Sequence, residues 1–261
     1  LFFLGGGINV SKNRNKYAVF FEIQPKPIEK IDIKIAGRFE EFENDSSFDP
    51  KISFKYIASE NLTLRASRSS SFSMPSMAQM FSSDINLGSV RDFDGNSPFV
   101  RQAQIGNPNL KPATSKNLNI GLIFENQKHR LSIDYWSIDY KNRIEAQSAQ
   151  VILNTDPNGP SITRNSNGDL IGVTTTYFNE ESTEVSGVDL SFNRLLASSD
   201  TFGDLSLAVN STTLIEFLTP ALGNEVSEIM INRVGKFNYD TNTHSLPKNR
   251  INAFLNWKYQ D

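Results

Sequence analysis

The sequence predicts an all-β chain that forms part of a transmembrane antiparallel β-barrel, and three observations support this fold class. Apolar and polar residues alternate in many short segments, as in barrel strands with one face toward lipid and one toward water. No apolar run approaches the roughly 18 residues that a membrane-spanning helix needs. Short and long connections alternate between the predicted strands, which places the long connections at one end of the barrel.

Composition limits the alternatives. The chain has 261 residues, of which 38% are hydrophobic, and its mean hydropathy is −0.38. No change in composition marks a boundary, so residues 1–261 are interpreted as one domain. With 26 basic and 29 acidic residues intermixed, the net charge is −3, which argues against nucleic acid as a partner. Cysteine is absent, which excludes disulfides and thiolate metal sites in this sequence.

The first half predicts four strands after a poorly patterned start that contains one tentative strand before Ser11. They span residues 17–24, 31–40, 51–56 and 62–67. Pro25 and Pro27 end the first strand, because proline cannot donate to a ladder. The second strand alternates most regularly, and a polar loop is expected at 43–49.

The second half continues the same rhythm. Strands are predicted at residues 118–124, 131–144, 183–192, 205–209 and 251–257, which makes about ten strands in all. Long connections separate some of them, at 68–117, 145–182 and 218–247. Within the second connection, Asn165 to Asp169 has the composition of a hairpin turn.

Alternation also predicts which residues face which medium. Lipid is expected to contact Ile31, Ile33, Ile35, Leu62 and Leu64, and water is expected to contact Asp32, Lys34, Arg38, Thr63 and Arg65. A sheet with two free edges cannot lie in hydrocarbon, since its edge groups would lack hydrogen-bond partners. The chain is therefore expected to be a fragment, cut at both ends, that does not close a barrel alone.

Four segments resemble motifs of one protein family. Residues 72–76 read Phe-Ser-Met-Pro-Ser before Gln-Met-Phe at 79–81, and residues 106–112 read Gly-Asn-Pro-Asn-Leu-Lys-Pro. Residues 185–190 read Val-Ser-Gly-Val-Asp-Leu, and residues 246–250 read Leu-Pro-Lys-Asn-Arg. In this order they resemble the "GFRAPS…ELF", "GNPxLKPE", "xxGxE/Dxxx" and "lPxxr" segments of TonB-dependent outer-membrane receptors. Ser71, Ser73 and Ala113 stand where the family has Gly, Arg and Glu.

The resemblance implies a barrel of about 22 strands with an N-terminal plug. It implies import of a scarce nutrient, such as a ferric siderophore, cobalamin or an oligosaccharide, across the outer membrane of a Gram-negative bacterium. Energy would come from the TonB complex, which pulls on a box before the plug. Neither plug nor box is in this sequence. The expected partners are the outer-membrane bilayer, a small nutrient ligand at the external loops and the TonB complex, with a monomeric protein and no cofactor.

Candidate metal and catalytic residues are few. Asp92, Asp94 and Asn96 offer oxygen ligands at alternate positions, but the Glu that completes a calcium loop is missing, so a solvated turn is favoured. His129 and His244 could in principle serve a hydrolase, but no nucleophile motif accompanies them. We therefore predict no catalytic residue, no metal site and no enzyme activity.

Aromatic and charged residues leave the ligand open. An interfacial girdle is favoured over ligand binding for five aromatic residues, Tyr135, Trp136, Tyr140, Trp257 and Tyr259. The predicted external loops contain Arg91, Arg101, Lys111, Arg164 and Arg233 beside Asp and Glu, so they do not indicate the sign of a ligand. Ligand-binding residues are not assigned from the sequence. The alternative functions are a passive porin and a surface adhesin without energy coupling.

Overall fold

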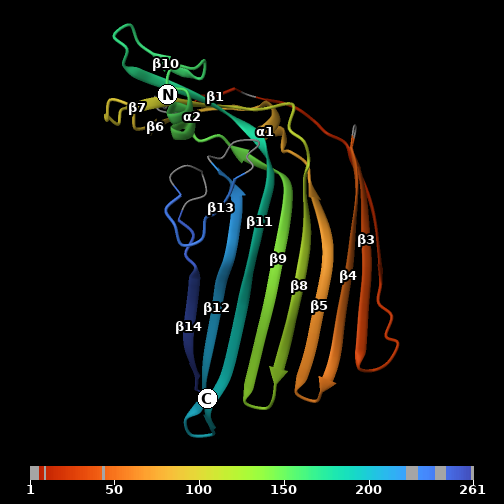
Figure 1. Ribbon diagram of the computed structural model, residues 1–261. Helices are drawn as coiled ribbons and strands as arrows, with labels where there is room; N and C mark the ends of the chain where they lie inside the picture. The colour runs from red at the N-terminus through yellow and green to blue at the C-terminus, as the bar shows by residue number, and fades with distance from the viewer. Residues whose placement is uncertain (1–5, 9, 43–44, 222–228, 239–244, 260–261) are drawn as a thin grey trace.

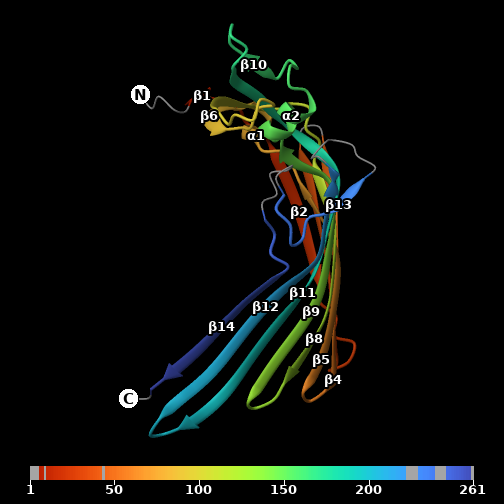
Figure 2. The ribbon, with the colours of Figure 1, turned by 60° about the vertical axis from the view of Figure 1, so that its left-hand side comes forward.

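The computed structural model describes residues 6–8, 10–42, 45–221, 229–238 and 245–259, which form a tall, curved antiparallel wall with smaller elements at one rim (Figure 1). The wall follows the order β2-β3-β4-β5-β8-β9-β11-β12-β14. Among the described residues, β2 and β14 each pair with one wall neighbour only, so the wall is open, as Figure 2 also shows. The all-β prediction is confirmed.

Most wall strands are longer than predicted, whereas β2 has the predicted length. Their bounds are β2 (Lys16–Ile23), β3 (Ile31–Phe42), β4 (Ser46–Ser59), β5 (Leu62–Ser73), β8 (Ala113–Glu125), β9 (His129–Ala146), β11 (Leu170–Ser199), β12 (Gly203–Pro220) and β14 (Asn249–Lys258). All neighbouring wall pairs are antiparallel. Each predicted strand therefore exists, and its alternating residues fall on opposite faces of the wall.

One prediction at the start of the wall is wrong. The polar residues at 46–49 do not continue a loop but begin β4, opposite the end of β3, with Ser47 paired to Glu40 and Asp49 to Arg38. Sequence pattern could not show this, because Ser47 and Asp49 lie on the same face of the wall as Arg38 and Glu40, and a strand with such polar side chains resembles a loop in composition. The tentative strand before Ser11 is the two-residue β1 (Gly6–Gly7), which pairs with β6 (Ser83–Ser89) at the rim and not with the wall.

The long connections lie at one rim of the wall, as the sequence predicts. At one rim the strands are joined by the short segments 24–30, 60–61, 126–128 and 200–202, and at the other rim by 74–112, 147–169 and 221–248 (Figure 1). We call these the short-connection rim and the long-connection rim. β3 ends at Phe42 and β4 begins at Ser46, so these two strands are also joined at the long-connection rim.

The long connections are not structureless. The first contains α1 (Met77–Phe81), β6 (Ser83–Ser89) and β7 (Phe99–Ile105), and the second contains α2 (Ala149–Thr155) and β10 (Ile162–Arg164). The third contains β13 (Met230–Asn232), which pairs with the end of β12. The predicted hairpin turn at 165–169 is confirmed, because it joins β10 to β11. No helix in the described part of the chain is long and apolar enough to span a membrane.

The elements of the first two long connections form one body, which we call the cap. β7 pairs in parallel with residues Gly172 to Thr176 of β11, beyond the point where β11 leaves β9. The buried apolar residues of the cap form a small core: Val90, Val100, Ala149, Leu153, Leu170 and Val173. Two loops that are far apart in sequence are thereby held together above the wall, as Figure 2 shows.

Candidate functional site

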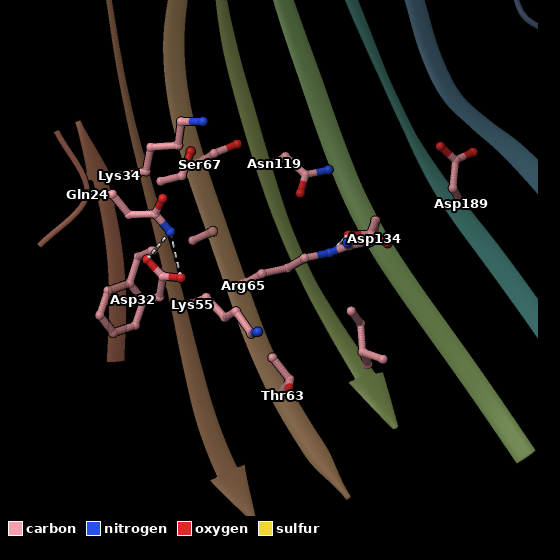
Figure 3. Close-up of a pocket in the computed structure, with 14 residues that line it drawn as sticks. Gln24, Asp32, Lys34, Lys55, Thr63, Arg65, Ser67, Asn119, Asp134 and Asp189 are labelled. Atoms are coloured by element: carbon pink, nitrogen blue, oxygen red, sulfur yellow. Dashed lines mark hydrogen bonds and ion pairs between the residues drawn. The ribbon is translucent and has the colours of Figure 1, made fainter. Parts of the chain in front are cut away.

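A row of polar residues crosses one face of the wall at a single height. Cross-strand pairing places these residues side by side from β3 to β14: Asp32, Lys55, Arg65, Gly121, Asp134, Asp189, Thr212 and Arg250. We call them the inner row and their face the inner face. Most of them line a hollow of about 710 Å³, shown in Figure 3.

The central contact of the inner row is a forked ion pair between Arg65 and Asp134. Arg65 donates through Nε to Oδ1 of Asp134 at 2.7 Å and through Nη2 to Oδ2. The two residues lie on β5 and β9, with β8 between them, so the guanidinium must cross the position of Gly121 (Figure 3). A Cβ atom at Gly121 would lie 2.0 Å from Oδ1 of Asp134. Glycine at this position therefore allows the pair to form.

The charges around the hollow nearly balance. Glu22 forms an ion pair with Lys34 at 2.8 Å, and Gln24 donates through Nε2 to both carboxylate oxygens of Asp32 at 2.9 Å. Thr212 donates to Asp189 at 2.7 Å. The inner face is thus polar and hydrogen-bonded, with no excess of one sign that would select an ion.

The structure places the residues predicted to face water and those predicted to face lipid on opposite faces of the wall. Asp32, Lys34, Thr63 and Arg65 line the inner hollow. Ile31, Ile33, Ile35, Leu62 and Leu64 lie at alternate positions on the opposite face, which we call the outer face. Arg38 is paired with Glu40 on the inner side. Contact of the outer face with lipid remains a prediction.

Two polar contacts tie the loops of the cap together. Arg164 donates to both carboxylate oxygens of Asp92 at 2.7 and 2.8 Å, and this guanidinium holds the pKa of Asp92 below its usual range. The carboxylate in turn raises the pKa of Arg164. Gln150 on α2 donates to the carbonyl of Arg91 and accepts from its amide, each at 2.8 Å. Both contacts join the first long connection to the second.

This arrangement also accounts for the candidate calcium loop. The carboxylate of Asp92 is occupied by Arg164, and that of Asp94 accepts from the amide and side chain of Asn96. The carboxylates therefore serve a turn and an ion pair. No group of three or more His, Cys, Asp or Glu side chains that could hold a metal ion occurs in the described part of the chain.

The structure separates the two histidines. His129 lies at the short-connection rim and stacks on Phe192 with ring centroids 6.4 Å apart. His244 lies outside the described residues. Among the described residues, no serine or threonine side chain forms a hydrogen bond with the His129 ring. The ring contact that the structure shows is the stack on Phe192.

The aromatic residues predicted as a girdle divide between the two faces. Trp136 lies over Gly187, where an added Cβ would meet its Cζ2 atom at 2.6 Å, and alternation places it on the inner face with Asp134 and Tyr140. Tyr135 lies on the outer face. Near the short-connection rim, Trp257 stacks on Phe202 at 5.4 Å and donates to its carbonyl at 2.7 Å. Tyr259 packs against the same tryptophan. Of the five predicted girdle residues, Trp257 and Tyr259 therefore form an aromatic cluster at this rim.

The cations predicted for the loops also divide. Arg91, Arg101 and Lys111 are exposed on the cap side of the wall. Arg164 is engaged by Asp92, and Arg233 is buried, donating to Thr219 and to the carbonyl of Pro220. Only the exposed cations are available to a ligand.

The segment at 106–112 has a structural role that the sequence did not reveal. An added Cβ at Gly106 would lie 2.6 Å from the amide nitrogen of Phe81, so glycine permits the close approach to α1. Asn107 donates to the carbonyl of Tyr177 at 2.9 Å. Asn179 on β11 accepts from the amide of Lys111 and donates to its carbonyl, at 2.7 and 2.8 Å. Sequence analysis missed Asn179, Asp134 and Gly121, because their roles depend on partners on other strands.

Comparison with known proteins agrees with the β-barrel architecture of the wall. The family model described as TonB dependent receptor-like, beta-barrel, matches residues 4–261. No curated protein sequence matches the chain.

Solved structures share the fold. The siderophore receptor PirA from Acinetobacter baumannii is 19% identical with a TM-score of 0.60, over 94% of this chain and 31% of the receptor. The ferric enterobactin receptor PfeA from Pseudomonas aeruginosa, as a G324V mutant, is 17% identical with a TM-score of 0.59, over 94% of this chain and 30% of PfeA. The RagAB peptide importer is 13% identical with a TM-score of 0.52, over 79% of this chain and 22% of that chain. The chain thus spans less than a third of these proteins.

Proposed function

The chain belongs to the TonB-dependent receptor family through its β-barrel domain, and on that premise we propose that its full-length protein imports a scarce nutrient across the outer membrane of a Gram-negative bacterium. This chain would supply part of the barrel wall and the external connections. The family is one of receptors and transporters, and we assign no catalytic residue.

The geometry that supports import most directly is the difference between the two faces of the wall. The inner row gives a continuous polar surface from β3 to β14, while the outer face at the same height is largely apolar. A barrel built in this way encloses a wet passage inside hydrocarbon. The cap lies at one rim, where a ligand arriving from outside would first meet the protein.

A ferric siderophore is our first candidate for the nutrient. Its support is the fold shared with PirA, which is named a siderophore receptor, and with PfeA, which is named a ferric enterobactin receptor. The cap offers exposed aromatic rings, Phe93 and Phe99, beside the exposed cations Arg91 and Arg101, a combination suited to an anionic ligand with flat rings. Cobalamin and oligosaccharides remain alternatives.

Energy coupling belongs to the same proposal. We propose that a plug domain before this chain occupies the barrel and passes force from the TonB complex. The protein would work as a monomer. The rival functions, a passive porin and a surface adhesin, require no such coupling.

An uptake measurement tests the proposal. Cells that lack their own siderophore receptors would express the full-length gene and receive a panel of iron-55 siderophores, with and without a functional tonB gene. Accumulation of iron that requires both genes is the expected result. Uptake that is equal without tonB would indicate a passive porin. Surface binding without uptake would indicate an adhesin.

A further inference from the structure

Three of the four methionines of the chain gather at the long-connection rim. Met74 directly follows β5, and Met77 and Met80 lie on α1. All three line one hollow of about 390 Å³, which we call the rim hollow. Figure 1 shows α1 near the upper end of β5. We call the three residues the methionine cluster, and the fourth methionine, Met230, lies on β13 outside this hollow.

The local structure directs the three side chains into one space. Ser76 is the N-cap of α1, and its side chain and that of Gln79 form a reciprocal capping box that fixes the start of the helix. Met77 and Met80 are three residues apart in this helix, so they lie on the same face. Met74 lines the same hollow from the end of β5. One short segment therefore supplies three thioether groups to a single site.

The rim hollow is closed by parts of the chain that are distant in sequence. The amide of Asn107 donates to the carbonyl of Gln79 at 2.9 Å, which holds the segment at 106–110 against α1. The apolar walls around the methionine cluster come from this segment, from α1 and from the end of β3: Phe42, Phe81, Pro108 and Leu110. The cluster therefore lies in a preformed space and not on a flat surface.

The charges at the rim hollow leave a surplus of cations. Lys12 and Arg14 line it beside one carboxylate, that of Asp45. Arg14 donates through Nη2 to the carbonyl of Pro75 at 2.7 Å and contacts Sδ of Met80 at 3.4 Å. The adjacent charges on β2 and β3 pair with one another: Lys16, Arg38 and Glu40. This surplus repels a divalent cation about twice as strongly as a monovalent one.

The type of ligand selects the ion. The absence of a metal site was predicted from carboxylates and histidines, whereas the thioether sulfur of methionine is a different class of ligand. Thioether sulfur is soft and uncharged, and it selects Cu(I), whereas carboxylate and carbonyl oxygens suit Mg²⁺ and Ca²⁺. A soft monovalent cation therefore matches both the sulfur atoms and the charge of the rim hollow.

We propose that the methionine cluster binds Cu(I) through its three thioether sulfurs. The ion enters from the long-connection rim and displaces the Arg14 guanidinium from Sδ of Met80. Methionines also fill irregular gaps in apolar packing. In that role a carbon atom can replace the sulfur, whereas a metal site loses its ligand. The inference does not depend on which nutrient the protein imports.

The test measures Cu(I) binding by the purified full-length protein in detergent. Ascorbate under argon keeps the copper reduced, and bicinchoninate competes for it, so that the colour of its complex reports the affinity. The triple variant M74L/M77L/M80L should bind Cu(I) at this site at least about a hundredfold more weakly, since even the loss of an outer-shell partner costs up to about that much. Leucine nearly matches methionine in volume, so the fold should persist.

Two controls make the result specific to the methionine cluster. M230L makes the same chemical change on β13 and should leave the affinity for Cu(I) unchanged. Binding of Zn²⁺ should be equal in the wild type and in M74L/M77L/M80L. Heat-modified gel mobility checks folding, and M77L alone, with an expected loss of about tenfold, replaces the triple variant if that variant does not fold.

X-ray absorption at the copper edge identifies the ligands directly. The wild type should show sulfur neighbours of copper that M74L/M77L/M80L lacks. An unchanged affinity in the triple variant, an equal loss in M230L, or copper without sulfur neighbours in the wild type would overturn the proposal. Iron uptake by the same variants reports separately on the proposed function, so failure of one proposal does not imply failure of the other.

Discussion

At the scale of single residues, the inner ion pair depends on Gly121. The Asp134 side chain is 9% exposed, so its charge needs the Arg65 guanidinium to offset the loss of hydration. That guanidinium reaches Asp134 only because Gly121 has no side chain. Three residues on three strands therefore act together, and none of them stands out in the sequence.

Gly121→Ala should destabilise the barrel by roughly 1–3 kcal/mol, because the new methyl group displaces the Asp134 carboxylate from Arg65. Urea unfolding of the full-length protein in bilayers measures the effect. Gly172→Ala is a matched control, since the nearest atoms to its added Cβ lie at 3.4 Å. Equal stability of both variants would show that the ion pair does not depend on the glycine.

The outer face permits a second prediction for a single residue. Leu64 is 41% exposed and lies on the outer face, opposite Leu122 of β8. Leu64→Arg should destabilise the protein in bilayers by roughly 2–4 kcal/mol, because the charge would enter hydrocarbon near the midplane. Thr63→Arg, on the inner face, should cost much less. An unchanged free energy of unfolding for Leu64→Arg would place Leu64 away from lipid.

At the scale of elements, β11 connects the wall to the cap. Its residues from Tyr177 to Arg194 pair with β9, and its first residues pair with β7 and β10. Asn179 lies near the change of partner and holds Lys111 by two hydrogen bonds. The strand therefore fixes the position of the first long connection as well as the second.

Asn179→Ala should release the segment at 106–112. The loss of the two bonds to Lys111 should increase amide exchange in this segment by about tenfold, as expected for roughly 1.4 kcal/mol of local stability. Hydrogen-exchange mass spectrometry measures the change. Gln150→Ala should instead affect residues near Arg91, which it contacts. If both variants increase amide exchange in the same segment, the two contacts do not stabilise separate parts of the cap as expected.

The Arg164–Asp92 contact predicts a dependence of the cap on pH. Because the pKa of Asp92 is lowered in the folded protein, its contribution to stability is complete above the ordinary Asp pKa. It is lost as the pH falls through the lowered value. Limited proteolysis of the cap should be constant from pH 7 to about 5 and should accelerate below about 4. In Arg164→Gln, cleavage should be faster at pH 7 and should change less with pH.

At the scale of the whole molecule, the strands of the wall could be predicted from the sequence, but the side-chain contacts between strands could not. Alternation revealed each wall strand, since one face is apolar and the other polar in most of them. The alternation of short and long connections revealed which rim has the loops. Strand alternation and connection lengths are properties of the local sequence, so they can be predicted from one sequence alone.

The cap could not be predicted in the same way. β6 and β7 are rich in Ser, Asn, Gly and Gln, and their pairing with each other and with β11 depends on partners far along the chain. Arg65 and Asp134 are 69 residues apart, and only the register of β5, β8 and β9 brings them together. Residues 43–49 were predicted as a loop, because a strand that contains Ser46, Ser47 and Asp49 resembles a loop in composition.

In the membrane, adjacent residues of each wall strand should face lipid and water alternately. The most direct measurement is nitroxide accessibility at Leu64→Cys and Thr63→Cys of the full-length protein in bilayers, with any cysteine outside this chain replaced. The label at position 64 should collide mainly with oxygen, which concentrates in lipid. The label at position 63 should collide mainly with a water-soluble nickel chelate. Similar collision rates at both positions would contradict a membrane-spanning wall.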